Sequence, residues 1–260
     1  MVEEHPCFEP PVDQSIGLWR YMDLAKFMSF LDSGALYFAR SDTLGDPFEG
    51  SVPVPNVEFY EKLKIDDELR KKVYPDLTPE SIDKMRAKIA EGRKIFAKSM
   101  FISCWHASNH ESAAMWSIYS RNDESISIKT SFEKLSNALP SLCHLGMVKY
   151  IDYNSDLIPE NNLFYPFLSK RLSFEFERES RAIIWNESSN FKVSDASSSR
   201  DIIIGESGIL VRIEIESLID EIYISPTAPY WFSELIKNIV SKYKLKIPVL
   251  HSALSAAPVY

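Results

Sequence analysis

The sequence predicts an α+β fold built around a split or mixed β-sheet, with helices attached to it. Strand-like and helix-like segments follow one another without the regular strand–helix–strand repetition of a parallel α/β protein. The 260 residues are 45% apolar and 25% charged, which is enough apolar material to bury one good core. The eight glycines form neither a G-x-G-x-x-G nor a G-x-x-x-x-G-K motif, so a Rossmann or P-loop site is not expected.

The N-terminal part predicts a strand, a helix and a second strand in close succession. Residues 17–22 alternate as a strand, and residues 24–31 have the apolar spacing of a helix. Asp23 is suited to cap the start of this helix, and Gly34 is suited to end it. The second strand is expected at residues 35–39 (ALYFA).

A loop and a highly charged helical segment come next. Residues 41–53 (SDTLGDPFEGSVP) are rich in turn formers and predict the loop. Residues 56–99 predict two helices that break at residues 74–76, the second restarting behind Thr78 with a first-turn proline. We expect this segment to be a helical insertion within a single α+β domain of residues 1–260. Solvated amphipathic helices are the simpler interpretation, and a lid or a surface for a protein partner is the alternative.

The rest of the chain predicts further strands and three more helices of appreciable length. The expected strands are residues 101–105, 125–130, 146–152, 179–186, 202–204, 209–215, 221–225 and 247–250. The expected helices are residues 109–120 behind a Ser108-x-x-Glu111 capping box, 165–176 and 230–244. The serine-rich residues 187–201 predict a loop.

Charge and cysteine content exclude several classes of protein. The net charge of −8 argues against a broad basic surface for nucleic acid. No apolar run approaches the roughly 20 residues that span a bilayer, and the acidic N-terminus lacks the apolar stretch of a secretory signal. No membrane association is therefore expected. The three cysteines, Cys7, Cys104 and Cys143, are odd in number and widely spaced, which predicts reduced thiols in the cytoplasm.

A row of charges leads directly into an apolar strand. Glu175, Glu177, Glu179 and Arg181 are each two residues apart, and the same spacing continues at Ile183. On a strand, side chains two apart share one face, and we expect the strand itself to begin at about Glu179. A carboxylate and a guanidinium that line a cleft are the functional interpretation, and a solvated sheet edge is the plain one.

Metal and thiol chemistry are weaker alternatives. Cys104, His106 and His110 lie close together, but a helix start between them separates the two histidines, and no H-E-x-x-H motif occurs. No metal is therefore expected. Cys104 with His106 resembles a nucleophile–base pair, although a buried cysteine in a core strand is the favoured interpretation.

Carboxylate chemistry leaves two arrangements open. Glu177 and Glu179 are too close in sequence to flank a sugar bond, so a glycosidase would need one of them together with Asp46 or Glu49. The other arrangement is a single carboxylate that stabilises an oxocarbenium-like centre, with Arg20 holding a phosphate or ribose. Aromatic faces for stacking, each of which core packing would also explain, come from Tyr21, Tyr37, Trp105, Trp116 and Tyr119.

Four segments, in chain order, resemble the signature blocks of an uncharacterised bacterial domain family, the domain of unknown function numbered twenty-nine seventy-one. They are LWRYMD, ALYFARSDTLGDPFEG, FISCWHASNHESAAMWSIYS and FEFERESRAII. The resemblance covers about residues 17–225. Its more specific parts are residues 46–49 (DPFE) and the pattern Met115-Trp116-x-x-Tyr119, in combination.

The order of these segments is also similar, more faintly, to the ADP-ribosyltransferase superfamily. That resemblance implies a split sheet in which Arg20 contacts NAD, Ser103 orders the site and Glu179 is the catalytic acid. It also implies a cleft lined by Asp46, Glu49 and Tyr119. Glu177 competes with Glu179 for the acid role, and Ser103-Cys104-Trp105 stands where the superfamily often has Ser-Thr-Ser.

The resemblance implies an NAD-consuming enzyme, with NAD as substrate, of the toxin or anti-phage defence class. Glu179 would orient the ribose and stabilise the cationic transition state, Arg20 would anchor the pyrophosphate or ribose, and Arg181 would keep Glu179 ionised. The alternative is a non-catalytic sensor module on the same fold that holds a nucleotide or a protein. In that case residues 56–99 would be its docking surface.

Overall fold

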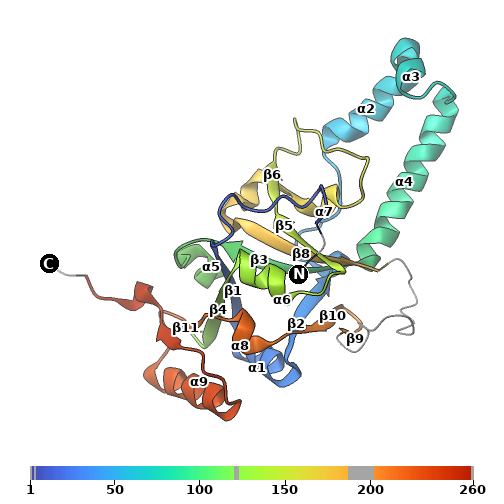
Figure 1. The fold of residues 1–260 in the computed structure, drawn as a ribbon. Coiled ribbons are helices and arrows are strands. Elements are labelled where there is room, and N and C mark those ends of the chain that lie inside the picture. Colours follow the sequence, from blue (N-terminus) through green and yellow to red (C-terminus); the bar gives the residue numbers. More distant parts are fainter. Residues whose placement is uncertain (1, 3, 120–122, 187–201, 259–260) are drawn as a thin grey trace.

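The computed structural model describes residues 2, 4–119, 123–186 and 202–258 (Figure 1). Its centre is a ten-stranded sheet, with helices packed on the sheet and one group of helices that extends away from it. All strand pairs in this sheet are antiparallel except β11 with β12, so the sheet is mixed. The expected α+β class is confirmed. The serine-rich residues 187–201 lie outside the described residues.

The sheet consists of two halves that meet at β3. One half contains β1 (Gly17–Asp23), β4 (Ser125–Ser131), β11 (Glu221–Ile224) and β12 (Val249–His251). The other contains β2 (Ala35–Arg40), β3 (Met100–Ala107), β5 (Cys143–Met147), β8 (Glu179–Trp185), β9 (Ile202–Ile204) and β10 (Gly208–Arg212).

The junction between the halves is split. Strand β8 pairs with β3 along residues 100–106 and occupies one whole edge of β3. Strands β1 and β2 therefore share the other edge: β1 pairs with His106 and Ala107, and β2 pairs with Phe101 and Ile102. Between these contacts β1 and β2 diverge, and no described strand pairs with residues 103–105 at this edge of β3. The expected split, mixed sheet is thus observed, and the split creates a gap bounded by three strands.

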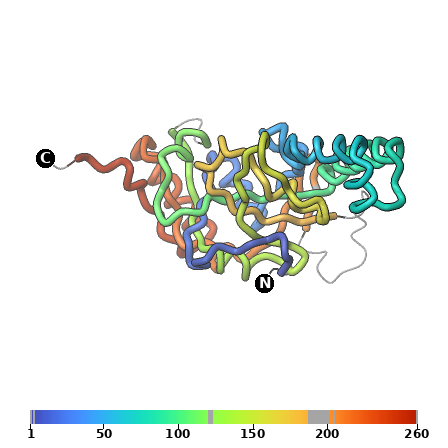
Figure 2. The backbone as a smooth tube through the Cα atoms, turned by 90° about the horizontal axis from the view of Figure 1, so that it is seen from above, coloured from blue at the N-terminus to red at the C-terminus, as the bar shows by residue number. Residues whose placement is uncertain are grey.

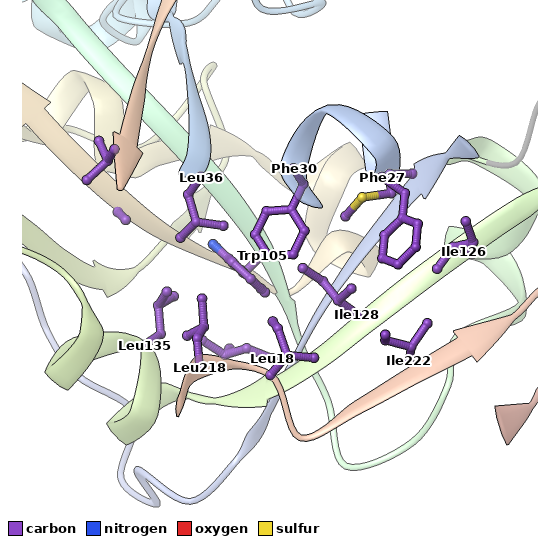
Figure 3. Close-up of a cluster of buried hydrophobic side chains, with 14 of the residues drawn as sticks. Leu18, Phe27, Phe30, Leu36, Trp105, Ile126, Ile128, Leu135, Leu218 and Ile222 are labelled. Carbon is purple, nitrogen blue, oxygen red and sulfur yellow. The ribbon is translucent and has the colours of Figure 1, made fainter. Parts of the chain in front are cut away.

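The elements around the split form where the sequence has capping residues and a regular apolar pattern. Helix α1 (Leu24–Ser33) begins at Asp23, whose side chain accepts the Lys26 N–H, and ends at Gly34 in the left-handed region with φ of 59°. Its buried Phe27 and Phe30 pack on the sheet within the main core, part of which is drawn in Figure 3. Further helices on this core are α6 (Phe132–Ala138), α8 (Ile215–Leu218) and α9 (Tyr230–Lys242).

Residues 54–99 form a helical arm that projects from the sheet, as Figures 1 and 2 show. It contains α2 (Val54–Ile65), α3 (Asp67–Val73) and α4 (Pro79–Ser99). The arm has a small core of its own, formed by Tyr60, Leu63 and Ile82. The predicted break and the restart behind Thr78 are observed, with Thr78 and Ser81 forming a reciprocal capping box. The additional break at Asp66, which caps α3, was not predicted.

Two predicted helices are wrong in their extent. The helix expected at residues 109–120 is α5 (Ala113–Tyr119), and Ser112 rather than Ser108 caps it by accepting the Met115 N–H. Residues 165–177 divide into α7 (Tyr165–Leu168), β7 (Ser169–Arg171) and the 3-10 helix η2 (Leu172–Glu177). Helical periodicity failed here because β7 pairs in parallel with β6 (Lys149–Ile151), a contact distant in sequence.

The strand expected at residues 146–152 is also divided. Strand β5 ends at Met147, β6 starts at Lys149, and the N–H of Val148 donates to the Glu179 carbonyl at 2.9 Å. The chain thus leaves the large sheet beside Glu179 and begins the small one. No helix among the described residues has both the length and the apolar character needed to cross a bilayer.

Candidate functional site

A cavity of about 420 Å³ opens at the split, a size within the range of small-molecule sites. Both walls of the split contribute to it, β1 on one side and β2 on the other, with β3 at its back. Of the residues predicted for a nucleotide site, those that line it are Arg20, Tyr21, Tyr37, Trp105, Tyr119 and Glu179. Cys104 and His106, considered for thiol chemistry, line it as well. Glu177, which competed with Glu179 in the sequence, lines it as well.

Arg20 bridges the two walls of the split. It lies in the middle of β1, and its Nη2 donates to the Tyr37 carbonyl of β2 at 2.7 Å. Its guanidinium carbon lies 5.6 Å from the centre of the Trp105 ring. Burial lowers the pKa of Arg20 to about 10, so the group stays charged at neutral pH. No described carboxylate forms an ion pair with Arg20, so within the described residues its charge in the cavity wall has no ion-pair partner.

Two carboxylates reach the cavity from a turn before β8. Glu177 ends η2, Glu179 begins β8, and both side chains are almost fully withdrawn from solvent. Arg178 between them has φ of 40° and ψ of 54°, the left-handed region that a non-glycine residue seldom adopts. Strained backbone of this kind clusters at functional sites.

Glu179 is held in an ionised state by two cations. Arg181 donates to both of its oxygens, at 2.9 and 3.1 Å, and Lys170 Nζ lies 3.3 Å from Oε2. Burial alone would raise the pKa of Glu179, but Arg181 and Lys170 outweigh it and lower the pKa to about 2. The Tyr150 hydroxyl accepts the Glu179 backbone N–H at 2.8 Å, which fixes the start of the strand.

Arg181 connects Glu179 to the loop at residues 41–53. Its Nη1 and Nη2 donate to the two oxygens of Glu49 at 2.7 and 2.6 Å, and Nη1 also donates to the Phe167 carbonyl at 2.6 Å. Arg181 is 0% exposed, so this charge is fully buried between two carboxylates. Glu49 and Arg181 do not line the cavity. Arg181 holds Glu179 from outside the cavity, and Glu49 in turn binds Arg181. Asp46 also stays outside and pairs with Arg171 at 2.8 Å.

Some of the predicted aromatic residues line the cavity, and Trp116 packs against one of them from outside it. The Tyr21 ring lines the cavity, and Trp116 packs against it edge-on with ring centres 4.9 Å apart, outside the lining. Burial raises the pKa of Tyr21 to about 12, so its hydroxyl stays protonated. Tyr37 and Tyr119 are half-exposed at 40% and 44%, which leaves their rings available to a ligand.

Ser103 is not brought to the cavity. It is 1% exposed, and its hydroxyl accepts the Trp105 Nε1–H at 3.2 Å, on the face of β3 opposite Cys104. Cys104 takes the cavity position instead, with its thiol hydrogen-bonded to Glu179. Burial and the neighbouring Glu179 raise the pKa of Cys104 well above its usual value, so the residue stays a thiol. That argues against the nucleophile–base pair considered from the sequence.

Lys170 was missed by the sequence reasoning. It is 8% exposed and pairs with both Glu177 and Glu179. Burial lowers its pKa, but the two carboxylates outweigh that effect and the net pKa is raised. Residues 165–176 were predicted as one helix, and a lysine there has no expected relation to Glu179. Predicting a strand at residues 169–171 would have been needed to place Lys170 beside Glu179.

Metal binding finds no support in the described part of the chain, which contains no group of three or more His, Cys, Asp or Glu residues placed to hold an ion. The His106 ring nitrogen Nδ1 instead contacts the Glu177 carbonyl at 2.6 Å. Burial lowers the pKa of His106, which keeps the ring neutral near pH 7.

Comparisons with known proteins give one weak likeness. No family model and no curated protein matches the sequence, so the resemblance to the uncharacterised bacterial family is not confirmed. Among solved structures, Thermus sp. 2.9 DarT in complex with carba-NAD+, with NAD+ and with ADP-ribosylated ssDNA is similar at 8%, 9% and 9% identity. The alignments cover 93%, 94% and 95% of this chain and 97%, 98% and 97% of those chains. Their TM-scores of 0.36, 0.38 and 0.37 are too low to assign a fold family or an activity.

Proposed function

We propose that this protein binds NAD in the cavity between β1 and β2 and cleaves the bond between nicotinamide and ribose. The ADP-ribose passes to a macromolecule or to water. The observation that carries the proposal is the pairing of opposite charges in one cavity. The lining includes a guanidinium with no carboxylate partner among the described residues, and it includes two buried carboxylates.

Arg20 provides the site for the pyrophosphate or a ribose. Its charge is only partly solvated, and its Nη2 already donates to a backbone carbonyl, so the remaining N–H groups are available to a ligand. Guanidinium groups bind phosphate oxygens in a fixed, two-point geometry. A phosphate would supply the negative charge that no described carboxylate places beside Arg20.

The carboxylates provide the other half of the chemistry. When the bond to nicotinamide breaks, positive charge develops on the ribose ring, and a fixed carboxylate in a water-poor cavity stabilises it. Glu179 is ionised over the whole neutral range because its pKa is about 2. Tyr21, Tyr37 and Tyr119 offer ring faces for the flat ends of the dinucleotide.

The test measures nicotinamide released from NAD by purified protein. We expect release by the wild type and its loss in Arg20→Gln and in the double variant Glu177→Gln with Glu179→Gln, which removes both cavity carboxylates. Arg212→Gln is the matched control for Arg20, because Arg212 is an exposed arginine on β10 that does not line the cavity. Transfer is then followed with labelled NAD and cell extract. A toxin or defence role belongs to the same proposal and is tested by growth of bacteria that express the chain.

A non-catalytic binding module is the second candidate, and one observation favours it. Arg181 and Lys170 contact the oxygens of Glu179, which leaves this carboxylate little capacity for a substrate. In that case NAD or another nucleotide would bind without turnover. Calorimetric binding of NAD with no release of nicotinamide would favour the module over the enzyme.

A further inference from the structure

We propose that Glu177, rather than Glu179, is the carboxylate that touches the bound dinucleotide, and that Glu179 is a positioning residue. This inference rests on the proposed function and divides its chemistry between two residues. Both carboxylates line the cavity, but they differ in how many of their lone pairs the protein already uses. The difference is visible in the hydrogen bonds.

Glu179 is fully engaged by protein groups. Its Oε1 accepts from Arg181 Nε, and its Oε2 accepts from Arg181 Nη2 and lies 3.3 Å from Lys170 Nζ. The Cys104 thiol adds another hydrogen bond. A ligand could reach Glu179 only by displacing one of these contacts, which would leave a buried charge without its partner.

Among the described residues, only Lys170 engages the Glu177 carboxylate. Its Oε2 pairs with Lys170, and no described group donates a hydrogen bond to Oε1. Glu177 is 8% exposed and lines the cavity. An oxygen in this state has free lone pairs for a ribose hydroxyl and lies in low-dielectric surroundings that strengthen its field.

The backbone at Glu177 and at the residue after it is fixed by protein contacts, so the position of Glu177 is specified before any ligand arrives. Its carbonyl contacts His106 Nδ1 at 2.6 Å. The next residue, Arg178, is in the left-handed region, and its carbonyl accepts the Ala107 N–H at 2.8 Å. Strained geometry held by several contacts is the pattern of a preorganised functional residue.

The protonation states agree with this division. Burial raises the pKa of Glu177 more than Lys170 lowers it, whereas the pKa of Glu179 falls to about 2. Two carboxylates whose environments separate their pKa values are typical of divided roles. The titratable groups around Glu177 are Lys170 of β7, Glu179 and Arg181 of β8, Tyr119 of α5, Tyr150 of β6 and His106 of β3.

The reaction assigned to this arrangement is balanced without an oxidant or a metal. The bond from the ribose carbon to the nicotinamide nitrogen breaks, and its electron pair leaves with the neutral nicotinamide. The positive charge left on the ribose lies beside the Glu177 carboxylate. Water or an acceptor hydroxyl then forms the new bond to the same carbon and releases one proton to solvent.

The experiment compares Glu177→Gln, Glu179→Gln and Glu175→Gln, the last being an exposed glutamate in the same turn of η2. We expect Glu177→Gln to keep the melting temperature of the wild type and to lose about 100-fold in kcat for nicotinamide release. Glu177→Asp should recover part of the lost kcat. Glu179→Gln should lower the melting temperature and reduce kcat of the folded fraction by less than about tenfold. Glu175→Gln should change neither.

A pH profile distinguishes positioning from mere structural support. Removing the charge of Glu179 frees Lys170 for Glu177 and removes a like charge, which lowers the pKa of Glu177. The acid limb of kcat should therefore move to lower pH in Glu179→Gln. An unmoved limb, or a larger kcat loss in Glu179→Gln than in Glu177→Gln, overturns the inference.

The outcomes separate this inference from the proposed function. If the wild type releases nicotinamide and Glu177→Gln does so equally well, only the inference fails. If the wild type binds NAD without cleaving it, the dissociation constant for NAD tests the inference. Glu177→Gln must then weaken binding at least about tenfold, and Glu179→Gln must not. If the wild type neither binds nor cleaves NAD, the proposed function fails and the inference fails with it.

Discussion

The guanidinium of Arg181 holds Glu179 through two hydrogen bonds, from Nε to Oε1 at 2.9 Å and from Nη2 to Oε2 at 3.1 Å. The same guanidinium binds Glu49 of the loop at 2.7 and 2.6 Å. One fully buried cation thus joins two carboxylates from distant parts of the chain. The charges at the cavity wall are consequently coupled to the stability of the fold.

Replacement of Arg181 by methionine should be strongly destabilising. Glu49 and Glu179 would each lose their guanidinium partner inside the protein, and breaking a buried pair in this way costs about 3–5 kcal/mol. Urea unfolding followed by circular dichroism gives the difference directly. Arg212→Met, an exposed site, should change the free energy of unfolding by less than about 0.5 kcal/mol. Equal effects of the two substitutions would contradict the buried network.

Glu179 should make the fold more stable at neutral pH than in acid. Its folded-state pKa of about 2 is below the ordinary 4.5, so its contribution is present above pH 4.5 and is lost as pH falls toward 2. That shift corresponds to about 3 kcal/mol. Glu179→Gln should lose this amount at pH 7 and show a flatter acid limb of stability. The measurement is the unfolding free energy of both proteins between pH 2 and pH 7.

Glu177 should change the stability of the fold with pH in the opposite direction. Its folded-state pKa is raised, so the stability it contributes is fully present below the ordinary pKa and is lost as pH rises through the folded-state value. Glu177→Gln resembles the protonated form and should therefore be at least as stable as the wild type at pH 7. Thermal melts at several pH values, with Glu175→Gln as the exposed control, test the sign. A strong loss at pH 7 would show that the ion pair with Lys170 outweighs burial.

Local signals predicted the elements around the split accurately. Asp23 and Gly34 bound α1 as expected, and β8 starts at Glu179, where the charged row meets the apolar run. Arg20 and Glu179 were both expected at one cleft, and both line the same cavity. The bounds of the elements were predictable because caps and alternation act over a few neighbours in sequence. The convergence of Arg20 and Glu179 was implied by the resemblance to the ADP-ribosyltransferase superfamily.

Contacts distant in sequence explain what was missed. Lys170 reaches the carboxylates only because β7 pairs with β6, a pairing that the helical spacing of residues 165–176 concealed. Ser103 and Cys104 are adjacent, and the burial of both β3 faces removed the pattern that would tell which one reaches a ligand. The role of Glu49 depends on how the loop folds back onto Arg181.

Gly50→Ala should loosen that loop. Gly50 has φ of 73°, and a Cβ atom there would lie 2.5 Å from Cε1 of Phe167, so both backbone and packing oppose any side chain. We expect a loss of about 1–3 kcal/mol and a weaker hold of Glu49 on Arg181. Gly45→Ala in the same loop is the matched control, because a Cβ at Gly45 meets nothing within 4 Å. Comparable losses in the two variants would show that the loop is sensitive to any substitution.

The helical arm should unfold separately from the sheet. Leu63 is 0% exposed and belongs to the small cluster that α2 and α4 form with each other. The arm is attached to the rest of the protein near its base, for example where the Val54 N–H donates to the Tyr153 carbonyl at 2.9 Å. Leu63→Ala removes most of one side chain from this small core, which costs about 2–5 kcal/mol locally. Hydrogen exchange should therefore accelerate in α2 and α4 and stay unchanged in β1 and β3. Ile65→Ala, at an 85% exposed position of the same helix, should leave exchange unaffected. If Leu63→Ala also accelerated exchange in β3, the arm and the sheet would be one cooperative unit, and a change in the arm would then reach the cavity.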